Sequence, residues 1–328
     1  MKKHIVLKLF VLLTAVPFFF SARSFAADPC GRACLEGAID NVIAAMIAHN
    51  PDQLMMAKDV LYTENGVALR PGDGMWGTLT ARGKYNLYVS DPEAGQAGFY
   101  GTVVENGRLN YIALRVKIVE ALITEIETIV VRPEGMNTSE QTKQSVGEKM
   151  DEMTVRPQFL QTVPPKHRMS REKLTEIANS YFMGLANQTG NFTAPFCETC
   201  ERWENGLHTT NQPPNPNVPK TMPDILAMGC EEQQKSGWFA FVTEIRDRRF
   251  PIVDVERGLV MAFAFFDHDA AVREYPLPDG SMTPNVITFP QTIHISELFE
   301  IRDGKIDQIE AVINSVPYGM RTEIWDKK

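Results

Sequence analysis

The run Thr63-Glu-Asn-Gly-Val67 returns 140 residues later as Trp203-Glu-Asn-Gly-Leu207. A helical pattern of apolar residues precedes each run, at about 35–46 and at about 174–185. After them, Ile123-Thr-Glu-Ile-Glu127 is matched by Ile306-Asp-Gln-Ile-Glu310, at an offset of 183. Matches that keep their order in this way indicate an internal repeat, with inserted residues in the second copy.

Both copies have the same predicted order of elements. A helix is followed by a short strand at the Glu-Asn-Gly turn, an irregular stretch, and then long strands in meander order. These strands are expected at 98–105, 108–118 and 122–131 in the first copy, and at 238–246, 258–267, 291–302 and 305–314 in the second. The match of Gly98-Phe-Tyr-Gly101 with Gly237-Trp-Phe-Ala240 places the insertions between about 245 and 292. A helix followed by antiparallel strands predicts an α+β fold.

Length and composition agree with two globular domains. The chain has 328 residues, of which 44% are hydrophobic and 23% charged, values that exclude a disordered chain and a coiled coil. We expect a first domain at 27–135, a polar linker at 136–168 and a second domain at 169–328. The net charge of −8 offers no basic surface for nucleic acid. No nucleotide-binding loop, serine nucleophile elbow or zinc-binding helix motif occurs, so we expect no cofactor and no metal.

The first 26 residues have the pattern of a secretory signal peptide. Lys2 and Lys3 precede an apolar stretch, Leu9 to Phe20, and Ser24-Phe-Ala26 offers a cleavage site before Ala27. An uncleaved N-terminal anchor is the alternative. The segment holds four basic residues and no acid, so its removal changes the net charge from −8 to −12. The sequence therefore predicts an acidic protein that is secreted or periplasmic and has no membrane span.

The odd number of cysteines leaves at least one thiol unpaired within the chain. Export permits disulfides. Spacing does not fix their connectivity, and our preferred pairing is Cys30 with Cys34 and Cys200 with Cys230, which leaves Cys197 free.

Several runs carry a resemblance to a known fold family. They are Thr63-Glu-Asn-Gly66, Gly72-Asp-Gly-Met-Trp76, Asp91-Pro-Glu-Ala-Gly95, Asp247-Arg-Arg-Phe-Pro251 and Ala262-Phe-Ala-Phe-Phe-Asp-His268. The chain resembles the nuclear-transport-factor-2-like, or SnoaL-like, superfamily, and more closely an uncharacterised secreted family of this fold from fungi and bacteria. The resemblance implies two tandem cones, each made of a curved sheet wrapped around helices, which pair through their sheets. It implies little about chemistry, because the superfamily includes isomerases, cyclases, dehydratases, epoxide hydrolases and proteins without catalysis.

One carboxylate stands out on the expected strand 291–302. Alternate residues of a strand share a face, and Glu297 falls in the apolar row of Ile293, Ile295, Phe299 and Ile301. The equivalent row of the first copy has no acid, since it consists of Ile112, Leu114, Val116 and Ile118. Burial would raise the pKa of Glu297 and suit it to general acid or base catalysis. A salt bridge to Arg248 or Arg249 is the alternative.

Other candidates are weaker. Asp267 and His268 follow an apolar run that we expect to be buried, and a carboxylate beside an imidazole is a plausible catalytic pair; a solvated strand end is the alternative. Substrate contacts are expected from charged, imidazole and aromatic side chains, with ion pairs and core packing as the alternatives: Arg248, Arg249, His294, Trp76 and Tyr88.

Two classes of function remain. The first is an exported, cofactor-independent lyase, isomerase or hydrolase that acts on a small organic molecule, with Glu297 or His268 as the base. The second is an exported ligand-binding or structural protein without catalysis. The two differ in whether Glu297, Asp267 and His268 converge on one cavity. Both predict a small-molecule ligand, and a homodimer is left open.

Overall fold

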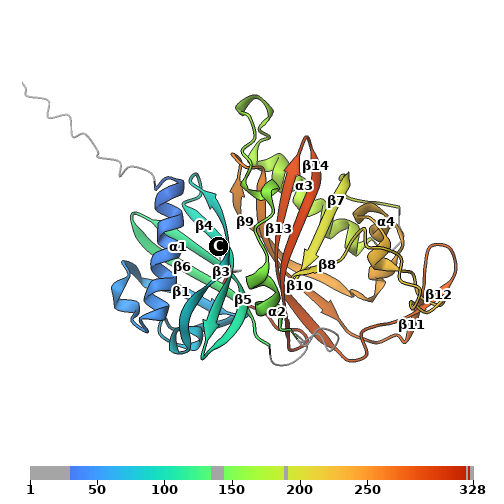
Figure 1. The fold of residues 1–328 in the computed structure, drawn as a ribbon, viewed down its shortest axis with the longest axis horizontal. Helices are drawn as coiled ribbons and strands as arrows, with labels where there is room; N and C mark the ends of the chain where they lie inside the picture. Colours follow the sequence, from blue (N-terminus) through green and yellow to red (C-terminus); the bar gives the residue numbers. More distant parts are fainter. Residues whose placement is uncertain (1–29, 134–143, 188–190, 323, 326–328) are drawn as a thin grey trace, which may run out of the picture.

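The computed structural model describes residues 30–133, 144–187, 191–322 and 324–325 (Figure 1). The predicted signal peptide lies outside these residues. The first half contains α1 (Arg32–Ile47) and a six-stranded sheet in the order β2-β1-β6-β5-β4-β3. Its strands are β1 (Met56–Glu64), β2 (Val67–Leu69), β3 (Leu79–Asp91), β4 (Gln96–Glu105), β5 (Arg108–Val119) and β6 (Leu122–Val131).

The second half repeats this plan with α3 (Arg171–Ala186) and a separate six-stranded sheet in the order β8-β7-β14-β13-β10-β9. Its strands are β7 (Phe196–Glu204), β8 (Leu207–His208), β9 (Glu244–Asp254), β10 (Leu259–His268), β13 (Gln291–Arg302) and β14 (Lys305–Val316). In each sheet one pair is parallel, β1 with β6 and β7 with β14, and the other pairs are antiparallel. The α+β class and the internal repeat are confirmed.

The Glu-Asn-Gly motif has the same structural role in both halves. Asn65 and Gly66 have φ angles of 49° and 83°, and Asn205 and Gly206 have 46° and 73°. Two successive positive φ values define a tight hairpin turn that favours Asn-Gly. The Asn65 side chain accepts a hydrogen bond from the Val130 amide at 2.8 Å, and the Asn205 side chain accepts one from the Ile313 amide at 2.9 Å. The motif therefore serves the fold.

A second pair of equivalent turns fixes the alignment of the middle strands. Gly95 and Gly258 have φ angles of 63° and 68°, and their carbonyls accept hydrogen bonds of 2.8 Å from Ile118 and Ile301. These positions give offsets of 163 for β3 and β4 and 183 for β5 and β6. The expected match of Gly98 with Gly237 is therefore wrong, since Met261 is the residue equivalent to Gly98.

Two insertions enlarge the second half, and the first of them lies before the expected range of 245–292. Residues 209–243 replace the short β2–β3 connection and form η5 (Ile225–Ala227), α4 (Cys230–Lys235) and η6 (Trp238–Phe241). Residues 269–290 replace the β4–β5 turn and carry the hairpin of β11 (Glu274–Pro276) and β12 (Met282–Pro284). The strand expected at 238–246 is wrong because its apolar start forms η6, a short helix that buries Trp238. In the first half, β3 lies in the stretch that we expected to be irregular.

Each helix covers one face of its own sheet, and the opposite faces of the two sheets pack together. One cluster joins α1 to the first sheet and another joins α3 to the second. A third cluster contains residues from both sheets, such as Tyr100 and Leu298. Part of the predicted linker is folded into this arrangement as α2 (Val146–Glu152), η3 (Pro157–Leu160) and η4 (Pro165–His167), with α2 lying between the halves in Figure 1.

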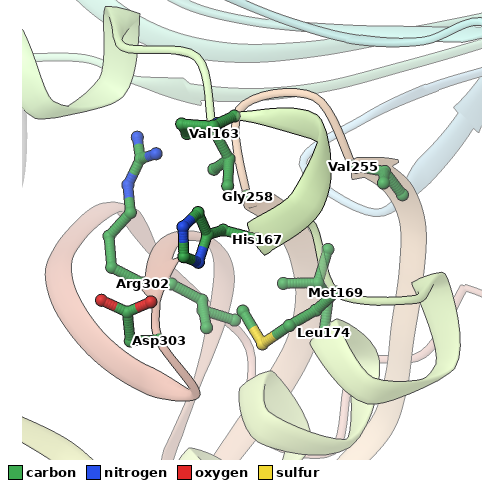
Figure 2. Close-up of a pocket in the computed structure, with 10 residues that line it drawn as sticks. Val163, His167, Met169, Leu174, Val255, Gly258, Arg302 and Asp303 are labelled. Carbon is green, nitrogen blue, oxygen red and sulfur yellow. The ribbon is translucent and has the colours of Figure 1, made fainter.

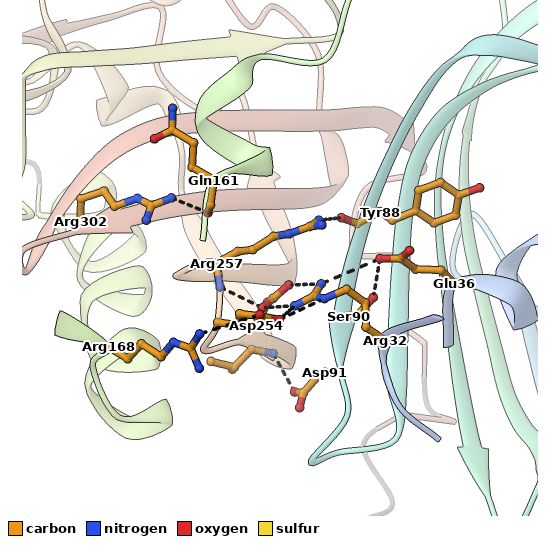
Figure 3. A network of polar contacts seen from close by, with 12 residues as sticks. Arg32, Glu36, Tyr88, Ser90, Asp91, Gln161, Arg168, Asp254, Arg257 and Arg302 are labelled. Carbon is orange, nitrogen blue, oxygen red and sulfur yellow. Dashed lines mark hydrogen bonds and ion pairs between the residues drawn. The ribbon is translucent and has the colours of Figure 1, made fainter. Parts of the chain in front are cut away.

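Reciprocal ion pairs hold the halves in a dimer-like arrangement, and Figure 3 shows the one between Arg32 and Asp254. Arg32 at the start of α1 donates to both carboxylate oxygens of Asp254 at the end of β9, at 2.7 and 2.9 Å. Arg171 at the start of α3 forms the equivalent ion pair with Asp91 at the end of β3. Equivalent contacts that are exchanged reciprocally between two halves are typical of a two-fold interface between identical subunits. Here the interface forms within one chain.

Candidate functional site

Glu297 lies at the centre of β13 and is only 1% exposed. Its row on the strand includes Ile295, Phe299 and Ile301, which belong to the cluster under α3. The side chain therefore lies on the apolar inner face of the second half, as the alternation along the strand predicts.

Two polar side chains meet Glu297 there, Tyr181 from α3 and Arg202 from β7. Tyr181 and Arg202 both favour the ionised form of the Glu297 carboxyl group. An Nη1–H of Arg202 donates to the Tyr181 hydroxyl oxygen at 3.3 Å, and the Nε of Arg202 lies 3.2 Å from a carboxylate oxygen of Glu204. Among the described residues, nothing hydrogen-bonds to Oε2 of Glu297. We call Tyr181, Arg202 and Glu297 the inner triad.

The environment of the inner triad shifts its proton equilibria. Burial raises the pKa of Glu297 from 4.5 to about 8, the Glu204 charge adds to this, and Arg202 and Tyr181 oppose it only in part. Burial also raises the pKa of Tyr181 well above its usual value, so its hydroxyl stays protonated. The site thus combines a carboxyl group that can exchange a proton near neutral pH, a neutral hydroxyl donor and a cation.

The first half shows what the fold needs at these positions. The offsets of 139, 140 and 183 place Val42, Tyr62 and Leu114 where the second half has Tyr181, Arg202 and Glu297. Val42, Tyr62 and Leu114 are all buried in the core under α1. Because the same fold packs well with these residues, the buried charges of the second half are not a requirement of the architecture.

The insertion at 209–243 covers the inner triad. Thr209 accepts a hydrogen bond from Nε of Arg202 at 2.9 Å, and the Phe239 ring lies 5.2 Å from the Arg202 guanidinium. Gln234 of α4 donates to the backbone carbonyl of Tyr181 at 3.0 Å. A disulfide between Cys200 of β7 and Cys230 of α4 ties the insertion to the sheet.

Both predicted disulfides are present. Cys30 is bonded to Cys34, Cys200 is bonded to Cys230, and Cys197 is the free thiol of the described cysteines. All five cysteines of the chain lie in the described residues.

Asp267 and His268 do not form the expected pair. Neighbouring residues of a strand point to opposite faces of the sheet. Asp267 accepts hydrogen bonds from Arg246 at 2.7 and 3.0 Å and from Thr292, and although burial raises its pKa, these bonds hold it below the usual value. His268 is buried on the other face and stacks on Phe241, with ring centroids 5.7 Å apart. Burial lowers the pKa of His268.

His294 and Arg249 belong to the contact between the halves. Arg249 pairs with Glu127 of β6, which also accepts a hydrogen bond of 2.8 Å from Arg115. Burial alone would raise the pKa of Glu127, but the two arginines lower it to about 2. His294 stacks on Phe265 at 4.4 Å, and burial lowers its pKa to about 4.

The remaining predicted contact residues also lie apart from Glu297. Arg248 donates to the Asn179 side chain at 3.3 Å, so neither Arg248 nor Arg249 forms the salt bridge considered for Glu297. Trp76 is fully buried in the core of the first half. The Tyr88 hydroxyl is hydrogen-bonded to Arg82 and Asp40 at the edge of the same half.

Several surface hollows lie elsewhere. One of about 190 Å³ in the second half is lined by Val163, His167, Met169, Leu174, Val255 and neighbouring residues (Figure 2). None of Glu297, Asp267 and His268 is among its lining residues, and Asp267 points to the opposite face of the sheet from His268. The convergence on one cavity that would distinguish an enzyme from a non-catalytic protein is therefore not observed. Within the described ranges, no group of three or more His, Cys, Asp or Glu residues is placed to hold a metal ion, and no helix is long and apolar enough to cross a membrane.

Comparison with known families points to the second half. Residues 167–313, less than half of the chain, are similar to a family described as a domain of unknown function (DUF8021). The matched range runs from just before α3 into β14 and contains the whole inner triad. No curated protein matches the chain.

Sequence reasoning missed Tyr181 and Arg202. Tyr181 was counted as an apolar member of a helix, and Arg202 directly precedes a motif that drew attention to the turn. The comparison of copies that singled out Glu297 would also have found them, because it pairs Tyr181 with Val42 and Arg202 with Tyr62.

Proposed function

We propose that this protein is an exported, cofactor-independent enzyme, a lyase, isomerase or hydrolase, with the inner triad as its catalytic centre. The observation that carries the proposal is the convergence of three polar side chains at positions where the first half has Val42, Tyr62 and Leu114. Burying a carboxyl group without full hydrogen bonding is unfavourable by several kcal/mol. A group that the fold does not need and that destabilises it is a candidate for catalysis.

The chemistry follows from the three groups. Glu297, with a pKa of about 8, transfers a proton to or from a small organic substrate. The Tyr181 hydroxyl and the Arg202 guanidinium stabilise negative charge that develops on a substrate oxygen. Because Phe239 lies over Arg202 in the part of the insertion that follows the Cys200–Cys230 disulfide, substrate enters when that part moves, as with the lids of other enzymes.

Export and the finer fold assignment belong to the same proposal. Two disulfides are typical of proteins in oxidising compartments and support export. A helix on one face of a curved, mixed sheet in each half supports the SnoaL-like cone. A non-catalytic ligand-binding or structural protein is the second candidate. It is favoured by the covered state of the triad and by the finding that Glu297, Asp267 and His268 line none of the described hollows.

The test looks for proton transfer directly. A panel of small carbonyl compounds and esters is incubated with the protein in D₂O, and NMR follows deuterium incorporation, isomerisation, elimination and hydrolysis. Glu297→Gln should lower the rate by about 10²–10⁴-fold, the usual contribution of a general acid or base. Tyr181→Phe should lower it less, because Arg202 remains.

The matched control is Glu300→Gln, on the same strand but on the opposite face of the sheet. It should retain the rate within about two-fold, as expected for a carboxylate outside the site. If a substrate of the wild-type protein is turned over equally well by Glu297→Gln, the triad is not the catalytic centre.

A further inference from the structure

The first half has a hollow of about 700 Å³ between α1 and the turns at one end of its sheet. Its walls come from one side of α1, from the β3–β4 turn and from the β5–β6 turn. Most lining residues are small or apolar, among them Ala38, Ala44, Met55, Val119 and Ala121. Met55 and Val119 are 69% and 46% exposed, so apolar surface faces solvent here. The volume is in the range of small-molecule sites.

The equivalent region of the second half holds two separate hollows. The offsets place Val255, Gly258 and Ile301 where the first half has Pro92, Gly95 and Ile118. Figure 2 shows Val163, His167 and Met169, which precede α3, at the same hollow, and its volume is about 190 Å³. A second hollow, of about 530 Å³, is lined by Ile177 and Phe196 among others. The charged side chains of Lys173 and Glu176 from α3 also line it. The shared fold therefore leaves hollows here in both halves. The first half differs in that its hollow is single and that its charged lining residues are both acidic.

The β5–β6 turn at this hollow is strained, whereas its counterpart is not. Glu120 and Ala121 have φ angles of 50° and 64°, and the equivalent Asp303 and Gly304 have 48° and 79°. Asp-Gly is the sequence that this turn favours, and a side chain other than that of Gly, Asn or Asp is unfavourable in this conformation. The strained turn keeps the Ala121 methyl group as part of the wall.

The charges at the rim select among apolar ligands. Glu93 and Glu120 are the charged residues among those that line the hollow, and both are acidic. Glu93 is 3.4 Å from Arg171, whereas Glu120 has no ion-pair partner among the described residues. The whole chain is also acidic, with a net charge of −8. A ligand with a positive charge at one end would be attracted, and an anion would be repelled.

We propose that this hollow is a binding site for a small apolar molecule that carries one positive charge, such as an alkylammonium or a hydrophobic amine. The apolar part occupies the space beside Ala38 and Ala44, and the cationic group lies near Glu120. The site is in the first half, so it does not depend on the inner triad of the second.

The test compares two probes of equal chain length, n-decylammonium and n-decanoate, by isothermal titration calorimetry below their micelle concentrations. The protein begins at Ala27, as the predicted cleavage requires. We expect one decylammonium per chain with a dissociation constant below about 1 mM, a modest affinity for a ligand of this size. Decanoate should bind at least about five-fold more weakly, because it meets the acidic rim.

Two matched variants locate the site. Ala44→Trp fills the hollow from an exposed position of α1, and Met183→Trp makes the same change at the equivalent exposed position of α3. Ala44→Trp should weaken decylammonium binding by about ten-fold or more, and Met183→Trp should leave it unchanged. Thermal unfolding confirms that both variants fold.

Three results would overturn the proposal. They are no binding of decylammonium to the wild-type protein, equal binding of decanoate, and wild-type affinity in Ala44→Trp. Glu120→Gln adds a finer check, since it should weaken decylammonium binding by about two- to five-fold, the effect of one exposed charge.

Discussion

Replacing Glu297 by Gln should change how the stability of the protein depends on pH. The pKa of this carboxyl group is about 8 in the folded protein, against a reference value of 4.5. Between these two values the folded state binds more protons than the unfolded state, so the free energy of unfolding falls as the pH rises. This penalty is fully absent below about pH 4.5 and fully present above about pH 8.

The magnitude follows from the size of the shift. Each pKa unit is worth about 1.4 kcal/mol, so the shift from 4.5 to about 8 corresponds to about 5 kcal/mol over the whole window. Between about pH 5 and about pH 8 the penalty grows by about 3 to 4 kcal/mol. Glutamine has nearly the same shape and does not titrate. Relative to the wild-type protein, Glu297→Gln should therefore gain stability by that amount between the two pH values.

Urea-induced unfolding at the two pH values measures this difference. Leu114→Gln, which places the same amide at the equivalent position of the first half, is the matched control and should lose equal stability at both pH values. Glu297→Leu gives the second half the residue type that the first half has at the equivalent position, Leu114. This variant should fold, because Leu114 packs well in the first half. The reasoning fails if the gain is absent or has the opposite sign. Either result would mean that Glu297 is ionised in the folded protein and paired with Arg202.

Two further predictions concern the interface and the thiols. Burial lowers the pKa of His294 from 6.5 to about 4, so the free energy of unfolding should fall by up to about 3 kcal/mol as the pH drops through this window. His294→Phe keeps the stacking on Phe265 and should remove that loss. Urea unfolding at about pH 4.5 and pH 7 measures the difference. Iodoacetamide added to the unfolded, unreduced protein should label Cys197 alone, as read by mass spectrometry of peptides, and labelling of Cys200 or Cys230 would contradict the observed disulfides.

The repeat is the part of the fold that the sequence predicts well. Turn chemistry is local, so Asn65-Gly66 and Asn205-Gly206 could be recognised without knowing the sheet that they join. Strands β5, β6, β13 and β14 follow from their alternating apolar residues and from short turns. The alignment of the middle strands was not predictable in the same way, because β3 and β9 share few residue types and a 35-residue connection precedes β9 where the first half has only nine.

The candidate site, too, could be predicted from the sequence only in part. The burial of Glu297 follows from alternation within one strand, which is a local property. Its partners come from α3 and β7, about a hundred residues away in sequence, and only the sheet order brings them together. The pairing of Asp267 with His268, in contrast, conflicts with the same alternation rule, since adjacent residues of a strand cannot share a face.

Comparison of the two halves separates the features that the fold requires from those that it does not. Where they agree, as in the Asn-Gly turns and the reciprocal Arg–Asp pairs, one physical need of the fold explains both copies. Where they differ, the fold does not explain the difference. The second half places a carboxyl group at position 297 that burial disfavours, although Leu114 shows that an apolar side chain fits there. The first half keeps Ala121 in a turn that favours glycine, although Gly304 shows the relaxed solution. Both departures destabilise the protein, and each lies at one of the two sites that we propose.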